Sequence, residues 1–154
     1  MRVTIIADGS YCDVTKAGGY GFWVVSERGR HAGGGSLKGR TLSSADAEMK
    51  AVAKALHYAL KHGIACGGDE VLIQTDCSDV LTRLERRRNP VERCVSDGLA
   101  LIHKLETQHA LHITYKHVKG HTGRRDPRFK AQWHCDRRAY AGMSELRKRR
   151  SETT

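Results

Sequence analysis

The sequence lacks any apolar run that approaches the length of a membrane-spanning helix, and its N-terminus lacks the pattern of a signal peptide. These absences predict a cytosolic protein that acts without a membrane. We also find no internal repeat and no linker that would divide domains. At 154 residues the chain suits one domain with a core. We therefore expect a single monomeric domain over residues 1–146, followed by a basic tail at 147–154.

Cysteine usage excludes two further classes of small protein. The cysteines are odd in number and form no C-x-x-C pair, so neither a disulfide framework nor a zinc ribbon is indicated. His117 and His121 have a spacing found in zinc sites, but no cysteine pair accompanies them, which makes structural zinc improbable. The run Gly33-Gly34-Gly35 is not followed by Gly-Lys-Ser/Thr, so a P-loop is also disfavoured.

Acidic residues are scarce relative to basic ones: 17 Asp and Glu stand against 27 Lys and Arg, for a net charge of +10. Four of the basic residues lie in the last nine positions, and others form the runs Arg86-Arg87-Arg88 and Arg124-Arg125. A basic solvated surface would account for this charge without any partner. Its spread through the body of the chain favours a binding face for a polyanion, most often nucleic acid.

Hydrophobic periodicity predicts an α/β protein. Three strands come first, then a helix with Ser43 or Ser44 as its cap and Gly63 after its end. A buried strand, two helices, another strand and a last helix follow. Opening hairpins and later β–α units imply one mixed sheet with helices on both faces. In order, the predicted elements are strands Arg2–Ala7, Tyr20–Ser26 and His31–Leu37, the helix up to Gly63, strand Val71–Thr75, helices Ser78–Arg87 and Glu92–Gln108, strand Leu111–Val118 and helix Phe129–Lys148.

Two carboxylates follow apolar strands directly. Asp8 comes after the first predicted strand and is followed by Gly9, and Asp76 comes after Val71–Thr75. Either acid alone is more often a turn former. If the two strands are parallel neighbours, their carboxyl ends lie side by side, which is where open α/β sheets place their sites.

Two more carboxylates fall on helix faces that are predicted to be buried. Glu48 begins the apolar stripe that continues through Val52, Ala55 and Ala59. Asp136 lies between aromatic residues of the last helix, on the face marked by Phe129, Trp133, Tyr140 and Met143. An acid on an inward face needs a partner. Glu48 could instead serve the helix dipole, and Asp136 could pair with Arg137 or Arg138.

Considered together, the four acids indicate a metal site. Gathered without a counter-charge they would repel one another, and carboxylate oxygens in a small space are the ligands of hard cations, so Mg²⁺ or Mn²⁺ fits better than zinc. Two such ions about 4 Å apart can activate a water and stabilise the leaving oxygen of a phosphodiester.

Five segments in order resemble one known family. These are "ADGSYC", "DAEMKAVAKAL", "QTDCSDV", "VKGHTG" and "CDRRAYAG", each on the element where the family has its counterpart. Over roughly Arg2 to Met143 the chain resembles ribonuclease H of type 1. The resemblance implies a five-stranded mixed sheet, with three antiparallel strands and then two parallel ones, flanked by helices.

The resemblance also implies an activity and its residues. The substrate would be the RNA strand of an RNA/DNA hybrid, cut to leave 5′-phosphate and 3′-hydroxyl ends. Asp8, Glu48, Asp76 and Asp136 would correspond to the carboxylates that bind two Mg²⁺ ions, with Mn²⁺ as a substitute. His121 would assist proton transfer and product release.

Substrate contacts are expected from Ser10, Cys12 and Ser44, and a 2′-hydroxyl would let such a site distinguish RNA from DNA. The chain has "SSADAE" where the family commonly has two asparagines before the glutamate, so it offers fewer amide contacts to the nucleic-acid backbone.

Two alternatives stay open. The first is a DNA-acting nuclease or strand-transferase on the same fold, such as a resolvase or integrase core. The "KGHTG" loop and Asp136 favour the ribonuclease over it. The second is a non-catalytic module that binds hybrids. The presence of all four acids disfavours it, because a binder gains nothing from negative charge placed against phosphates.

Overall fold

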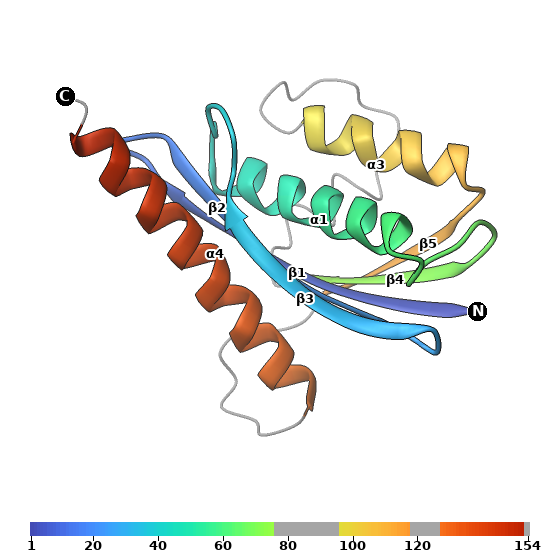
Figure 1. The fold of residues 1–154 in the computed structure, drawn as a ribbon. Helices are drawn as coiled ribbons and strands as arrows, with labels where there is room; N and C mark the ends of the chain where they lie inside the picture. The colour runs from blue at the N-terminus through green and yellow to red at the C-terminus, as the bar shows by residue number, and fades with distance from the viewer. Residues whose placement is uncertain (76–95, 118–126, 153–154) are drawn as a thin grey trace.

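The computed structural model describes residues 1–75, 96–117 and 127–152 (Figure 1). The predicted helix Ser78–Arg87 and the first residues of the helix predicted at 92–108 lie outside the described part of the chain. None of the described helices has the length and apolar character needed to cross a membrane. In chain order the elements are β1 (Arg2–Cys12), β2 (Ala17–Ser26), β3 (Gly29–Ser36), α1 (Ser44–Lys61), β4 (Glu70–Thr75), α3 (Ser96–Gln108), β5 (His112–His117) and α4 (Pro127–Glu152).

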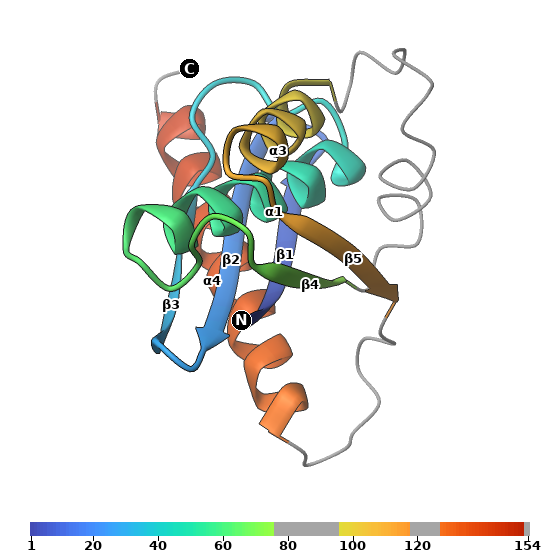
Figure 2. The ribbon, with the colours of Figure 1, turned by 90° about the vertical axis from the view of Figure 1, so that its right-hand side faces the viewer.

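The five strands form one mixed sheet in the order β3-β2-β1-β4-β5. The first three strands pair antiparallel, whereas β4 pairs parallel with β1 and β5 parallel with β4. Helices α1 and α3 cover one face of the sheet, and α4 crosses the other (Figures 1 and 2). The predicted α/β fold, with its mixed sheet of three antiparallel and two parallel strands, is confirmed.

The face of the sheet beneath α1 carries the main apolar core. Successive strand residues point to opposite faces, so Val3, Ile5 and Ala7 of β1 pack toward α1 while Ile6 packs toward α4. The α1 stripe that was predicted to be buried is buried, and it meets Val71 and Ile73 of β4. Removal of this apolar surface from water is the principal force that holds α1 on the sheet.

The face beneath α4 is built differently, because glycine takes the place of large side chains there. A Cβ atom at Gly19 would collide with the carbonyl of Ala139, and one at Gly142 would collide with the carbonyl of Gly35. The helix backbone therefore lies directly on the strands. The buried residues of α4 are mostly small, namely Ala131, Gln132, Cys135, Ala139, Gly142 and Met143.

This packing overturns the predicted inward face of α4. Trp133 is 45% exposed and Tyr140 is 56% exposed, so the aromatic residues line the solvent side, although Met143 is buried as expected. Large rings cannot fit between a helix and a glycine-lined sheet, and for this reason the small residues face inward. The side chain of Phe129 lies outside the described part of the structure.

Helix α4 is also longer than predicted. It begins at Pro127, where a proline is tolerated because the first helical N–H has no partner, and it continues through Glu152. Most of the basic segment expected as a tail is thus the last part of this helix. The division of the chain at residue 146 stays a prediction.

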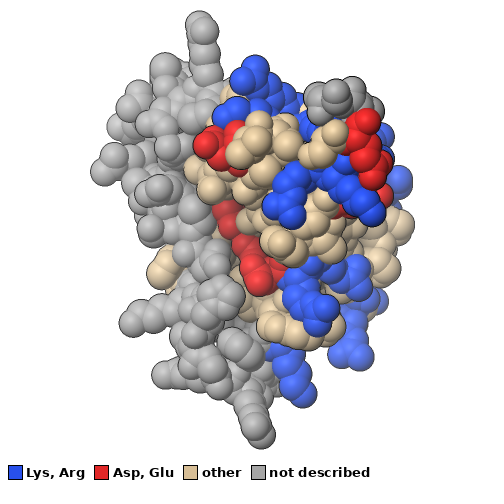
Figure 3. Space-filling view, turned by 90° about the vertical axis from the view of Figure 1, so that its left-hand side faces the viewer, with Lys and Arg blue, Asp and Glu red and all other residues tan. Residues whose placement is uncertain are grey.

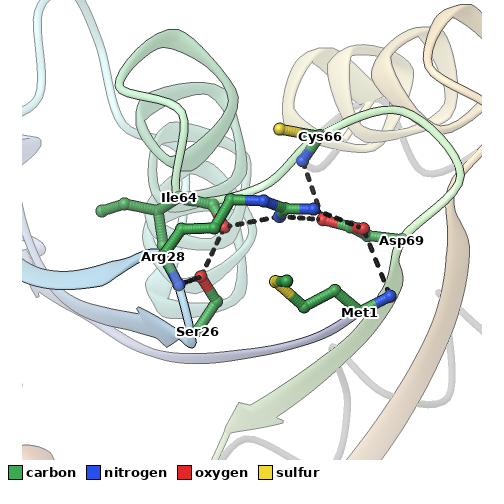
Figure 4. Close-up of polar contacts among 6 residues, drawn as sticks. All are labelled: Met1, Ser26, Arg28, Ile64, Cys66 and Asp69. Atoms are coloured by element: carbon green, nitrogen blue, oxygen red, sulfur yellow. Dashed lines mark hydrogen bonds and ion pairs between the residues drawn. The ribbon is translucent and has the colours of Figure 1, made fainter.

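An ion pair with a buried carboxylate lies at the amino end of β1 (Figure 4). The guanidinium of Arg28 donates to both carboxylate oxygens of Asp69, at 2.5 and 3.1 Å, and to the carbonyl of Ile64 at 3.2 Å. The backbone N–H of Cys66 donates to Asp69 at 2.8 Å, and the amino group of Met1 lies 3.5 Å away. The guanidinium holds the pKa of Asp69 well below its usual range, even though burial opposes the shift.

Candidate active site

Asp8 lies within β1 and not at its end, which corrects the predicted strand boundary at Ala7. The strand continues to Cys12 because β2 pairs with it from Thr4, opposite Val25, to Cys12, opposite Ala17. Asp8 is 4% exposed. An acid in the middle of a strand is not a turn former, so the structural explanation for this residue no longer applies.

The alternation of β1 directs Asp8 toward α4. Asp8 shares a face with Ile6, which packs against Ala131 and Cys135. The thiol of Cys135 donates to the carbonyl of Ile6 at 3.5 Å. Asp8 therefore belongs to the interface between β1 and α4, where Asp136 follows Cys135 directly.

Two glycines beside Asp8 bring both helices close to it. A Cβ at Gly9 would lie 2.5 Å from the backbone nitrogen of Glu48, so β1 passes directly against the first turns of α1. Gly21 pairs with Asp8 across the sheet, and a Cβ there would collide with the carbonyl of Cys135. Because glycine has no side chain at these two positions, α1 on one face and α4 on the other can both lie close to the same point of β1.

The start of α1 is held firmly, which fixes the position of Glu48. Ser43 caps the helix by accepting a hydrogen bond from the N–H of Asp46 at 3.0 Å. Asp46 accepts from the N–H of Leu42 at 3.0 Å and pairs with Lys50 at 3.0 Å. This buried acid is structural, because Lys50 offsets its charge. Glu48 is 7% exposed, as predicted for an inward position.

The charges of three predicted acids act on the thiol of Cys135. Burial raises the pKa of the Cys135 thiol, and the negative charges of Asp8, Glu48 and Asp136 raise it further against the opposing charge of Arg138. The three acids come from β1, α1 and α4 respectively, which lie far apart in the sequence. Segments far apart in the sequence thus carry negative charges that act on one buried thiol.

The remaining predicted acid and the histidine are Asp76 and His121, and both lie outside the described residues. The parallel register pairs Ile6 of β1 with Gln74 of β4, and β4 ends at Thr75. Thr75, the last described residue before Asp76, therefore lies at the level of Ala7 in β1. The prediction that the two strands are parallel neighbours is confirmed, but β1 continues to Cys12, so the carboxyl end of β4 lies beside the middle of β1.

The candidate substrate contacts differ in exposure. Ser10 and Cys12 are half-buried and follow Asp8 on the same face of β1, whereas Ser44 is exposed at the start of α1, one turn before Glu48. Hydrogen bonds with Thr15, and to a smaller extent the charge of Arg147, lower the pKa of Cys12.

The donor set fits a hard divalent cation. Asp8, Glu48 and Asp136 offer only carboxylate oxygens, which suit Mg²⁺ and Mn²⁺ better than softer metals. Within the described residues, no three His, Cys, Asp or Glu side chains are grouped closely enough to hold a metal ion.

Positive charge surrounds acidic groups on the surface. Figure 3 shows Lys and Arg side chains spread over one face of the molecule, with Asp and Glu gathered in smaller groups among them. With a net charge of +10, such a surface attracts a polyanion.

Sequence reasoning missed two residues that build the site. Cys135 appeared only in the cysteine count and within a motif, yet it is buried between α4 and β1 and its thiol is influenced by three of the acids. Gly21 received no role in the site from the sequence, yet its lack of a side chain lets α4 lie beside Asp8. A sequence pattern could have identified both residues: a glycine-rich strand occurs together with a helix whose small residues recur at helical spacing.

Solved structures with the same architecture define the ribonuclease H fold for this chain. The N-terminal RNase H domain of a Mycobacterium tuberculosis protein has a TM-score of 0.72 at 21% identity, with 96% of each chain covered. RNase H1 from the archaeon Halobacterium salinarum has a TM-score of 0.70 at 20% identity, covering 94% of this chain and 99% of its own. LC11-RNase H1, solved in complex with an RNA/DNA hybrid, has a TM-score of 0.72 at 16% identity, covering 94% and 98%.

Residues 1–144 match the RNase H family, so the chain belongs to this family. No curated protein matches the sequence. Family membership and the RNase H1 neighbours support a nuclease. The predicted family and fold are thereby confirmed.

Proposed function

We propose that this protein is a divalent-metal-dependent endoribonuclease that hydrolyses the RNA strand of RNA/DNA hybrids and leaves 5′-phosphate and 3′-hydroxyl ends. The observation that carries the proposal is the close approach of two helices to β1 at Asp8, in a chain of the RNase H family. Gly9 lies directly against the backbone of Glu48, and Gly21, opposite Asp8, lies against the backbone of Cys135, the neighbour of Asp136. A neighbour of the same fold was solved in complex with an RNA/DNA hybrid, which supports the substrate class.

The proposed metal ligands are Asp8, Glu48, Asp76 and Asp136. When bound, Mg²⁺ or Mn²⁺ would supply activation of a water and stabilisation of the leaving oxygen. The RNase H family generally uses divalent ions, which supports this assignment. His121 would take up and return a proton at this anionic site, because an imidazole titrates near neutral pH.

The proposed substrate contacts follow from the positions of the polar residues around the acids. Ser10 and Cys12 continue the Asp8 face of β1, and Ser44 lies one turn from Glu48. Hydroxyl and backbone groups at these places would meet the sugar and phosphates of the RNA strand, where the 2′-hydroxyl distinguishes RNA from DNA. The expectations of a cytosolic monomer stay predictions.

The decisive test compares labelled RNA/DNA hybrid, duplex DNA and duplex RNA in Mg²⁺, Mn²⁺ or EDTA, with Asp8→Asn beside the wild type. We expect cleavage of hybrid RNA alone, its loss in EDTA, and a fall of at least about a hundredfold in Asp8→Asn, because the ligand contributes several kcal/mol to transition-state stabilisation. Undiminished cleavage by Asp8→Asn would refute the mechanism. Cleavage of duplex DNA alone would establish the DNA-acting alternative, and hybrid binding without cleavage would establish the binding module.

A further inference from the structure

The solvent side of α4 carries a row of aromatic and basic residues that the proposed nuclease chemistry does not use. Trp133, Arg137, Tyr140 and Arg147 follow one another at intervals of four, three and seven residues, which keeps them on one side of a helix. All four are exposed. We call this row the α4 stripe. It extends about 21 Å along the helix axis, at 1.5 Å per residue.

The side chains of the α4 stripe contact one another. The guanidinium carbon of Arg137 lies 4.7 Å from the centre of the Trp133 ring, within the range of a cation–π interaction. The side chains of Ser144 and Arg147 lower the pKa of the Tyr140 hydroxyl because they stabilise its ionised form. Each ring of the stripe is thus accompanied by a cation.

Exposure of these rings is unusual for this molecule. In the described part of the chain, Trp133 and Tyr140 are the two aromatic residues among the large hydrophobic side chains that are exposed. Tyr20, Phe22 and Trp23 are at least partly buried. Exposed rings gathered on one helix face, and not scattered singly, mark an interaction site.

The charge of α4 identifies the kind of partner. The helix contains eight Lys and Arg residues against three Asp and Glu, a net of +5 and therefore half of the net charge of the chain. A polyanion is favoured, and aromatic rings interleaved with cations are the surface on which unpaired bases stack while phosphates are neutralised. A duplex hides its base faces and would leave the rings unused.

We propose that the α4 stripe is an accessory binding surface for single-stranded nucleic acid. The partner would lay successive bases against Trp133 and Tyr140 and its phosphates against Arg137 and Arg147. This surface would hold a single-stranded region beyond the site of cleavage. Because binding there needs neither the carboxylates nor a metal, the inference can fail without the proposed nuclease activity failing, and the reverse also holds.

Fluorescence anisotropy in EDTA tests the proposal with two labelled 12-mers of equal charge, dT12 and an abasic strand. We expect dT12 to bind more tightly, and Trp133→Ala to weaken its binding on the order of tenfold, since stacking contributes that much per base. Trp133→Phe, which keeps a ring, should retain most of the affinity. Equal binding of the two strands, or an unchanged affinity in Trp133→Ala, would overturn the proposal.

The cations are tested by the dependence of dT12 binding on salt. Arg137→Ala and Arg147→Ala should each reduce the slope of log K against log[salt] by about 0.7, the value for one phosphate contact on a single strand. Arg30→Ala, an equal charge change at an exposed position of β3, should leave the slope unchanged. Equal loss of slope in all three variants would mean that net charge alone binds the strand and would refute the stripe.

Direct contact is measured in a Trp23→Phe background, in which Trp133 is the remaining tryptophan of the two in the chain. Titration with dT12 should quench its fluorescence, and duplex DNA of equal length should quench it much less. Unchanged fluorescence, or equal quenching by the duplex, would contradict a single-strand site at Trp133. Circular dichroism of each variant verifies that the fold is intact.

Discussion

Buried acids occur at both ends of the β1–β4 pair, and their surroundings are opposite. At the amino end, Asp69 is surrounded by cations and donors, with Arg28 and the terminal amino group beside it, and its pKa is lowered. Further along β1, the charges of Asp8, Glu48 and Asp136 act together on Cys135, whose pKa is raised. An acid that stabilises the fold is compensated by a cation of the chain. Under the proposed function, Asp8, Glu48 and Asp136 would instead contribute negative potential for a bound metal ion.

The largest effect expected from this comparison is on stability. Asp69→Asn should lower the free energy of unfolding by about 2 kcal/mol at neutral pH, because it removes charge-assisted hydrogen bonds made by a buried carboxylate. Urea unfolding in EDTA measures the change. Nuclease activity at a temperature where the variant is folded should be close to that of the wild type.

Asp8→Asn provides the crossed control for this experiment. It should lose nuclease activity while its unfolding free energy in EDTA changes by less than that of Asp69→Asn. If both variants lose stability equally and activity equally, the two ends of the sheet do not differ in role, and the comparison is wrong.

The pH dependence of stability sharpens the contrast. Since the pKa of Asp69 is lower in the folded state than its ordinary value of 3.8, its contribution is fully present above that value and is lost as the pH falls below it. The slope attributable to this group is at most about 1.4 kcal/mol per pH unit. Urea titrations between pH 5 and about 2 should therefore show a steeper fall for the wild type than for Asp69→Asn. Parallel curves would mean that Asp69 is not stabilised by Arg28.

Much of this fold could be predicted because the α1 face follows the periodicity rule. Val52, Ala55 and Ala59 recur at helical spacing and are buried, so the helix and its inward acid Glu48 were both foreseen. The α4 face could not be foreseen in the same way. There, contact is made by backbone lying on glycines such as Gly21, and hydrophobic patterning carries no information about such contact.

The same distinction explains the candidate site. Asp8 and Glu48 stood out because an acid interrupted an apolar pattern, and both are buried. Asp136 was predicted to be a site residue because aromatic residues flank it on one face of the helix. That reason was wrong, because Trp133 and Tyr140 face solvent. Its neighbour Cys135, a small residue on the packed side, was the true indicator of the buried face.

A smaller effect is expected from metal binding itself. At a Mg²⁺ concentration about ten times the dissociation constant, the wild type should gain about 1.4 kcal/mol of stability relative to EDTA, because the ion binds the folded state alone. For a domain of this size that corresponds to roughly 3–6 °C in the melting temperature. Asp69→Asn should keep this shift and Asp8→Asn should lose most of it. A shift of equal size in Asp8→Asn would place the bound ion elsewhere.

The smallest effect separates two adjacent serines at the start of α1. Ser43→Ala should cost about 1 kcal/mol, because Ser43 caps the helix through the N–H of Asp46, whereas Ser44→Ala should change stability by less than about 0.5 kcal/mol at its exposed position. Urea unfolding measures both. In the Asp8→Asn background, we expect Ser44→Ala to weaken binding of RNA/DNA hybrid more than Ser43→Ala does, because Ser44 is a proposed contact with the RNA strand. If Ser43→Ala weakens hybrid binding more than Ser44→Ala does, the cap and not the exposed hydroxyl is what the substrate requires.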